Sequence, residues 1–228
     1  RGSCFEVRQV TYDTGRQPIA GTWRTETNTP TVRLLRKCEL AQFGRAISRA
    51  FFTDPLMQYL EPNEEKRRKF GNWFLTRTVK YCEKWGEVYT DDNLAGGGAW
   101  LTPGNTTMTI MRILRNGLWQ LPFRLGTGGL ARLNKFDSAT AKVHKRVMKG
   151  DHWYLLLLGV DPDQQSNGIG SAAIEAGAAK AQQAGLPVYL ETMTQSNVDY
   201  YQKRGFEVAE EFDVDHRLHV WAMVRQPS

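Results

Sequence analysis

The stretch "LLLLGVDPDQQSNGIGSAAI", residues 155–174, says more about the fold than any other part of the sequence. It begins with an apolar run typical of a buried strand, which Pro162 ends. Gly168 and Gly170 then open a helix. The first N–H groups of a helix lack partners within it and lie at the positive end of the helix dipole. Because glycines let an anion approach these groups, the stretch predicts a phosphate or pyrophosphate site.

The same turn also matches a dinucleotide-binding fingerprint. Residues 168–173 spell G-x-G-x-x-A, and Glu191 follows about 20 residues later, where such folds place a ribose-binding acid. In those folds the strand runs almost directly into the first glycine, whereas residues 161–167 intervene here. An NAD(P)-dependent oxidoreductase therefore stays as the alternative function.

The order of predicted elements indicates a mixed α/β (α+β) fold. Strand, helix, helix and two strands precede residue 105, and strand, helix, strand, helix and two strands follow residue 150. This order is typical of a mostly antiparallel central sheet with helices on both faces and one parallel βαβ crossover. We expect residues 1–30 to be an N-terminal extension, residues 31–228 a single domain, and about residues 105–150 a helical insertion.

Composition limits the classes of function. The chain of 228 residues carries a formal net charge of +6, and its 30 basic residues are interleaved with 24 acidic ones. No basic run resembles a nucleic-acid-binding arm, no apolar run approaches the roughly 20 residues of a membrane span, and the opening residues lack a signal peptide's apolar stretch. The cysteines and histidines show no metal-ligand spacing. We expect a cytoplasmic protein with a small-molecule partner and no metal, nucleic acid or membrane; a homodimer stays open.

An apolar stripe in the predicted insertion keeps one more alternative. Apolar residues recur at helical spacing through residues 110–121, with arginines on the other side. Such a stripe most often covers a sheet or a pocket, which is the interpretation we favour. A membrane-surface helix, or a nucleic-acid binder that uses the basic helices, is the alternative.

Two motifs carry a resemblance to a known family. "GVDPDQQSNGIGSAAI", residues 159–174, resembles the acetyl-CoA-binding motif of the GNAT family of N-acetyltransferases, and "SNVDYYQKRGFEV", residues 196–208, is similar to the segment that follows it there. Segments such as "AFFTDP" and "AWLTP" more loosely resemble the puromycin N-acetyltransferase subgroup and its antibiotic-modifying relatives. The resemblance implies a GNAT-like fold and an acetyl-CoA-dependent enzyme. A non-catalytic CoA-binding module on the same fold is a second alternative.

The motifs also indicate which residues would bind coenzyme A. Backbone N–H groups at the glycine turn would bind the pyrophosphate, with Gln165 and Ser166 at its rim. The family pattern implies that the pantetheine arm lies along the end of the apolar strand, where a bulge would open a slot. Asn197 would cap the next helix, contact the arm, or do both. The full predicted set is Leu158, Gly159, Val160, Gln165, Ser166, Asn167, Gly168, Ile169, Gly170, Ser171 and Asn197.

Catalysis would need a base and an acid. Glu191, at the end of the strand after the glycine helix, is the candidate base for deprotonating an amine; a surface ion pair is its alternative role. The register of the second motif favours Tyr201 as the acid that protonates the leaving thiolate, with one of the two adjacent tyrosines in the core. Phe52, Asp54 and Trp100 are the candidate acceptor-binding residues. The predicted acceptor is a small-molecule amine, antibiotic-like or amino-acid-like.

Overall fold

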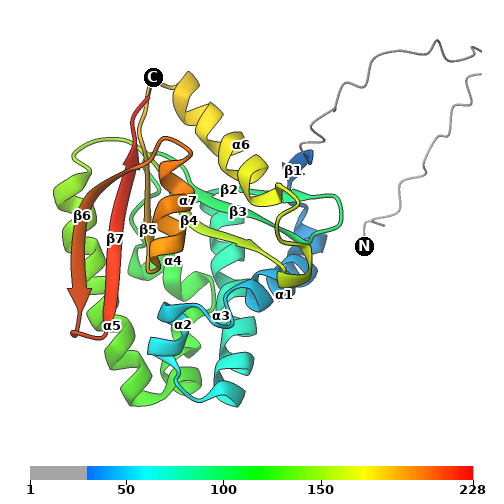
Figure 1. The fold of residues 1–228 in the computed structure, drawn as a ribbon. Helices are drawn as coiled ribbons and strands as arrows, with labels where there is room; N and C mark the ends of the chain where they lie inside the picture. Colours follow the sequence, from blue (N-terminus) through cyan, green and yellow to red (C-terminus); the bar gives the residue numbers. More distant parts are fainter. Residues whose placement is uncertain (1–29, 228) are drawn as a thin grey trace, which may run out of the picture.

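A seven-stranded sheet runs through residues 30–227, the part of the chain that this computed structural model describes (Figure 1). The strand order is β1-β2-β3-β4-β5-β7-β6, and only β4 and β5 are parallel neighbours. The strands are β1 (Val32–Leu34), β2 (Gly86–Asp91), β3 (Gly96–Leu101), β4 (Trp153–Val160), β5 (Val188–Thr192), β6 (Glu207–Val214) and β7 (Leu218–Arg225). The predicted mixed fold is therefore confirmed, and the dinucleotide alternative loses its support because such folds have a mostly parallel sheet.

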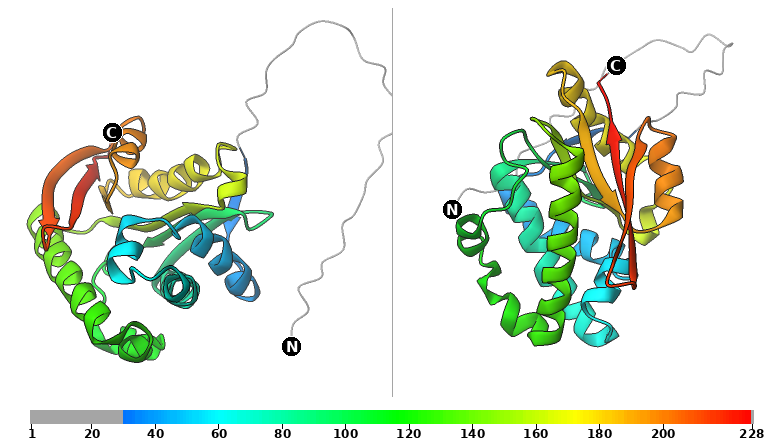
Figure 2. Two further views of the ribbon diagram at one scale, coloured as in Figure 1. Left: turned by 60° about the horizontal axis from the view of Figure 1, so that its bottom comes forward. Right: turned by 90° about the vertical axis from the view of Figure 1, so that its left-hand side faces the viewer.

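Helices cover both faces of this sheet (Figure 2). One face packs on α6 and α7, and the other packs on α1, α3 and α5, as three separate apolar clusters show. The helices are α1 (Leu40–Ala50), α2 (Pro55–Leu60), α3 (Glu64–Trp85), α4 (Ile110–Arg115), α5 (Leu121–Val147), α6 (Ile169–Gln183) and α7 (Gln195–Gln202), with short 3-10 turns η1 (Lys37–Glu39), η2 (Leu118–Gln120) and η3 (Pro162–Gln164). Their starts follow local chemistry: Asp54 caps α2 ahead of Pro55, and Asn63 caps α3.

The segment between β3 and β4 forms α4, η2 and α5. Helix α5 contains one non-helical residue, Gly126, whose φ of 67° lies in the left-handed region that glycine adopts without strain. Beyond this kink, α5 packs along the sheet near β6 (Figure 2). The extension predicted for residues 1–30 lies, apart from Pro30, outside the described residues. Within residues 30–227, no helix has the length and apolar character needed to cross a membrane.

Strand β4 diverges from β5 after a short contact. The two strands pair only at Trp153 and Tyr154, and they then separate (Figure 1). On its other edge, β4 pairs with β3 with a shift in register, which leaves Leu156 as an extra residue. Such a bulge bends a strand and increases its local twist. The predicted bulge is present, and it lies at the start of the gap between β4 and β5.

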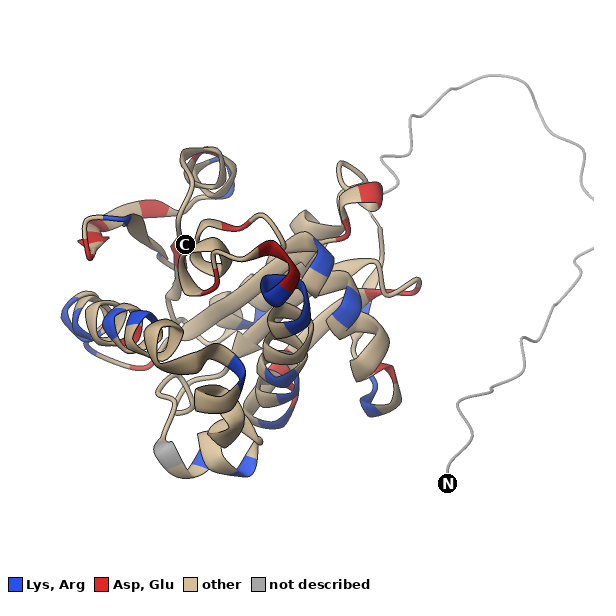
Figure 3. Ribbon diagram, turned by 90° about the horizontal axis from the view of Figure 1, so that it is seen from below, with Lys and Arg blue, Asp and Glu red and all other residues tan. Residues whose placement is uncertain are grey.

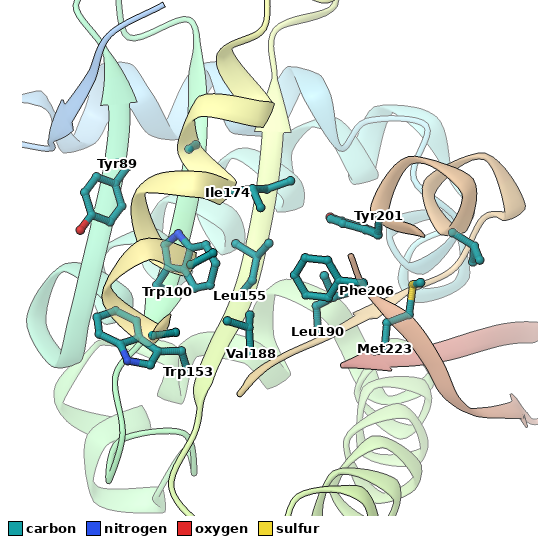
Figure 4. Packing of buried hydrophobic residues seen from close by; sticks show 14 residues of the cluster. Tyr89, Trp100, Trp153, Leu155, Ile174, Val188, Leu190, Tyr201, Phe206 and Met223 are labelled. Carbon is teal, nitrogen blue, oxygen red and sulfur yellow. The ribbon is translucent and has the colours of Figure 1, made fainter. Parts of the chain in front are cut away.

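The small residues of α6 allow it to lie close to the sheet. An ideal Cβ at Gly177 would lie 2.3 Å from Cε2 of Trp100, which is fully buried between the sheet and α6 (Figure 4). Trp153 packs against Trp100 in an edge-to-face arrangement, with ring centroids 6.3 Å apart. Trp100 is therefore part of the core beneath α6.

Candidate active site

A cavity of about 710 Å³ lies where β4 and β5 separate. The end of β4 and the start of α6 form one side of it, and α7 and the end of β5 form the next. The remaining wall comes from the end of α1 and from α2, α3, α4, η2 and α5. The structure therefore brings both sequence motifs and the segment between β3 and β4 to one cavity.

The glycine turn lies at one end of this cavity. Gly168 is the N-cap of α6 and has a φ of 80°. Because glycine has no side chain, no side-chain cap accepts hydrogen bonds from the N–H groups of the first turn of α6. Ser166 also has a positive φ, of 66°, so the backbone turns sharply before the helix begins. Gln165 through Ser171 all line the cavity. These positions agree with the predicted anion site at the helix start.

The free edge of β4 faces the gap. The N–H of Asp161 donates to the carbonyl of Ala95 over 2.8 Å, on the β3 side of the strand. Because backbone groups alternate in direction along a strand, those of Leu158 and Val160 point the other way. The side-chain amide of Gln165 donates to the carbonyl of Val160 over 3.3 Å. The Leu158 backbone and the N–H of Val160 are thus available to an extended ligand in the gap.

A polar cluster that sequence reasoning missed lies between the glycine turn and α7. Arg204 donates to Oγ of Ser171 over 2.6 Å, and its guanidinium lies 3.5 Å from the centroid of the Tyr200 ring. The Tyr200 hydroxyl is itself 3.2 Å from Oγ of Ser171. Arg204 is the one cationic side chain among the described residues that line the cavity. Its place four residues after Tyr200 is the signal that could have identified it.

Helix α7 brings Tyr201 to the cavity. Tyr201 is 7% exposed, and burial raises the pKa of its phenol, which keeps it protonated at neutral pH. Tyr200 lines the same cavity, so neither of the paired tyrosines lies only in the core. Thr194, not Asn197, caps α7: its Oγ1 accepts from the backbone N–H of Asn197 over 3.3 Å. The capping role considered for Asn197 is therefore wrong, and Asn197 lines the cavity.

Glu191 lies on β5 where the cavity begins. Its carboxylate accepts hydrogen bonds from the Tyr154 hydroxyl and, over 2.9 Å, from the Tyr189 hydroxyl. Burial raises the pKa of Glu191 to about 7, although the two phenols act in the opposite direction. His144 of α5 stacks on Tyr189 with ring centroids 4.2 Å apart and supports this arrangement. No ion pair to Glu191 occurs among the described residues, so its geometry suits proton transfer.

Of the three predicted acceptor-binding residues, only Asp54 lines the cavity. Asp54 lines the cavity, and its carboxylate caps α2 by accepting from the N–H of Leu56 over 2.9 Å. Desolvation raises the pKa of Asp54 to about 6. The predictions for Phe52 and Trp100 need correction, because neither lines the cavity. Phe52 lies under the guanidinium of Arg68, 4.4 Å from the ring centroid, and Trp100 is in the core.

A third carboxylate in the cavity comes from α5, where sequence reasoning found no motif. Asp137 lines the cavity together with Phe136 and Leu133. Its side chain is solvent-accessible there, and partial desolvation raises its pKa to about 6. The charges of Asp137 and Glu191 are close enough to influence each other. Among the described residues, no group of three or more metal-ligating side chains is arranged to hold a metal ion.

Known proteins match this chain in sequence. The model of the acetyltransferase (GNAT) family matches residues 124–206, which include the glycine turn and α7. An uncharacterized N-acetyltransferase of Schizosaccharomyces pombe is 31% identical over 188 residues, 78% of this chain and 76% of that protein. The chain belongs to the GNAT acetyltransferase family. The resemblance of the two motifs is thereby confirmed at the level of the family, and this GNAT protein is an acetyltransferase enzyme.

Solved structures share the fold of this GNAT protein. A structure from Corynebacterium glutamicum, described as histone acetyltransferase HPA2 and related acetyltransferase, has a TM-score of 0.63 at 21% identity, covering 88% of this chain and 97% of that one. Arylalkylamine N-acetyltransferase 2 from Aedes aegypti has a TM-score of 0.60 at 13% identity, covering 88% and 100%. The mixed sheet and its flanking helices are thus the architecture of known acetyltransferases.

Proposed function

We propose that this GNAT enzyme transfers the acetyl group of acetyl-CoA to the amine of a small molecule, and that residues 31–228 act as one domain. The observation that carries the proposal is that Glu191 and Tyr201 line the same cavity as the glycine turn. A proton acceptor, a proton donor and an anion site within one cavity are what a direct transfer requires.

The donor would bind along the gap between β4 and β5. The N–H groups at the start of α6 would hold the pyrophosphate, and Arg204 would add a positive charge beside it. The backbones of Leu158 and Val160 would hydrogen-bond the pantetheine arm in the manner of an added strand. The thioester would then lie deeper in the gap, toward the bulge at Leu156 and within the cavity that Tyr201 lines.

The reaction would then need two proton movements. An alkylamine of pKa ~10.4 is roughly a thousandth or less free base at neutral pH, so a base accelerates attack on the thioester carbonyl. Glu191 would accept the amine proton as the C–N bond forms, directly or through a water. As the C–S bond breaks, Tyr201 would donate its proton to the departing thiolate. The products are the N-acetyl amine and coenzyme A with a free thiol.

The experiment that tests this function measures thiol release from acetyl-CoA with a panel of amines, and identifies the product by mass. The loose resemblance to the puromycin N-acetyltransferase subgroup makes an antibiotic-like amine one candidate acceptor, so puromycin and an aminoglycoside belong in the panel. We expect amine-dependent thiol release and a product heavier by one acetyl group. Thiol release that does not respond to any amine would contradict the proposal.

A further inference from the structure

The acceptor side of the cavity combines apolar walls with one available carboxylate. The walls come from α2, α3, α5, the end of β5 and the residues around α4 and η2. Their apolar side chains are Leu56, Phe74, Met108, Ile113, Leu118, Leu121, Leu133, Phe136 and Met193. An acceptor body held here loses contact with water and gains few hydrogen-bond partners, which favours an apolar body over a polyhydroxylated one.

The carboxylates of the cavity differ in their availability. Asp54 caps α2, and Glu191 accepts from two tyrosine hydroxyls. The carboxylate of Asp137 has neither a hydrogen bond nor an ion pair within residues 30–227, and Asp137 lines the same cavity. An ionised carboxylate in a partly desolvated site gains from a cationic partner. The cationic side chain of the cavity, Arg204, is bound to Ser171 at the opposite, donor end.

These two features define an acceptor with one charge at one end. We propose that the acceptor is a primary monoamine with an apolar aryl or alkyl body, whose ammonium binds Asp137 beside Glu191. This rests on the proposed function, and it adds the substrate class. The other two carboxylates already accept hydrogen bonds, so a second ammonium, as in a diamine, would gain no comparable partner, and its desolvation would weaken binding. Asp137 binds and orients the amine, while Glu191 accepts its proton.

The test compares 2-phenylethylamine and hexylamine with 1,4-diaminobutane and an aminoglycoside on the full chain. Calorimetry measures binding without acetyl-CoA, and thiol release measures turnover. We expect the two apolar monoamines to bind at least about tenfold more tightly than the diamine, and Asp137→Asn to raise their Kd and KM at least about tenfold. The KM for acetyl-CoA stays unchanged in that variant.

Two further variants make the test specific. Asp151→Asn changes an exposed carboxylate outside the cavity, and it leaves both constants unchanged. Phe136→Ala removes part of the apolar wall, and it weakens binding of 2-phenylethylamine more than binding of the diamine. This second variant decides the matter if Asp137→Asn does not fold.

The outcomes separate the two proposals. Turnover of the diamine or the aminoglycoside in preference to the monoamines, or an Asp137→Asn variant with unchanged Kd for the monoamines, overturns the inference and leaves the proposed function standing. Binding of the monoamines that depends on Asp137, without thiol release from acetyl-CoA, supports the inference and overturns the proposed function.

Discussion

Tyr189 donates a hydrogen bond to Oε1 of Glu191 over 2.9 Å, from two residues earlier on the same strand and the same face. Tyr189 is also the last residue of β5 that pairs with β4, opposite Tyr154, which donates to the other oxygen. The carboxylate is therefore held at the point where the two strands separate. It lies between the rigid, paired part of the sheet and the cavity, so its orientation is fixed before an amine binds.

Glu191→Gln removes the proposed base. Because burial raises the pKa of Glu191 to about 7, its ionised form increases as the pH rises through neutrality, and kcat/KM for the amine rises with it. A second rise follows at the pKa of the amine. In the variant, the limb near neutrality disappears, and kcat/KM falls by about 10²- to 10⁴-fold at about pH 8. If kcat/KM of Glu191→Gln still rises with pH near neutrality, Glu191 is not the group whose ionisation causes that rise. The control is Glu207→Gln, which changes an exposed carboxylate on β6.

Tyr201→Phe removes the proposed acid and little else. We expect kcat to fall by about 10²- to 10⁴-fold, because the thiolate loses its proton donor, while the Kd of coenzyme A stays the same. Steady-state kinetics and calorimetry measure the two quantities. Tyr59→Phe is the matched control, since the Tyr59 hydroxyl is buried without a partner among the described residues and lies outside the cavity. Full turnover in Tyr201→Phe would remove this tyrosine from the mechanism.

Arg204→Ala tests the donor end. A guanidinium hydrogen bond to an anionic ligand contributes about 1.5–3 kcal/mol, so the KM for acetyl-CoA rises about tenfold or more. Salt screens exposed charges, so the difference from the unmodified protein narrows at high ionic strength. The adjacent Lys203→Ala changes an exposed cation outside the cavity and leaves this KM unchanged. If both variants raise the KM for acetyl-CoA equally, the general surface charge, and not a direct contact by Arg204, accounts for the change.

Gly177→Ala tests the packing of α6 on the sheet. The added methyl would lie within 2.7 Å of three atoms of the Trp100 indole, which is fully buried. Overpacking of this kind costs about 1–3 kcal/mol, which chemical denaturation measures as a loss in the free energy of unfolding. Gly150→Ala meets no atom within 4 Å and serves as the control. An unchanged midpoint in Gly177→Ala would show that α6 moves away from the sheet at little cost.

Local sequence chemistry was sufficient to predict the elements around the glycine turn, where we propose that the acetyl donor binds. The strand, the break at Pro162, the glycine turn and the helix depend on neighbouring residues, and the predicted set from Gln165 to Ser171 lies along one cavity. Thr194 took the capping role considered for Asn197 because a cap is decided by one residue's backbone angles, which a run of polar residues leaves ambiguous.

The acceptor end depends on contacts between distant segments. Every residue of β3 is buried, so no alternation of polar and apolar residues shows which face Trp100 occupies. Asp137 is on a helix that changes direction at Gly126, and its facing direction follows from how that helix packs on the sheet. The distribution of charged residues did not indicate the acidic character of the cavity either. Basic residues are distributed over α1, α3, α4 and α5 (Figure 3), whereas the cavity contains three carboxylates.

The wall that carries Asp137 begins and ends at adjacent points of the sheet. Leu101, at the end of β3, pairs directly with Tyr154 at the start of β4. The segment that forms α4, η2 and α5 connects these two strands in the sequence. An exchange of this segment is expected to leave the pairing of Leu101 with Tyr154 intact if the new segment keeps His144, whose ring stacks on Tyr189. Grafting the corresponding segment of another acetyltransferase between these strands would be a direct route to redirecting amine selectivity.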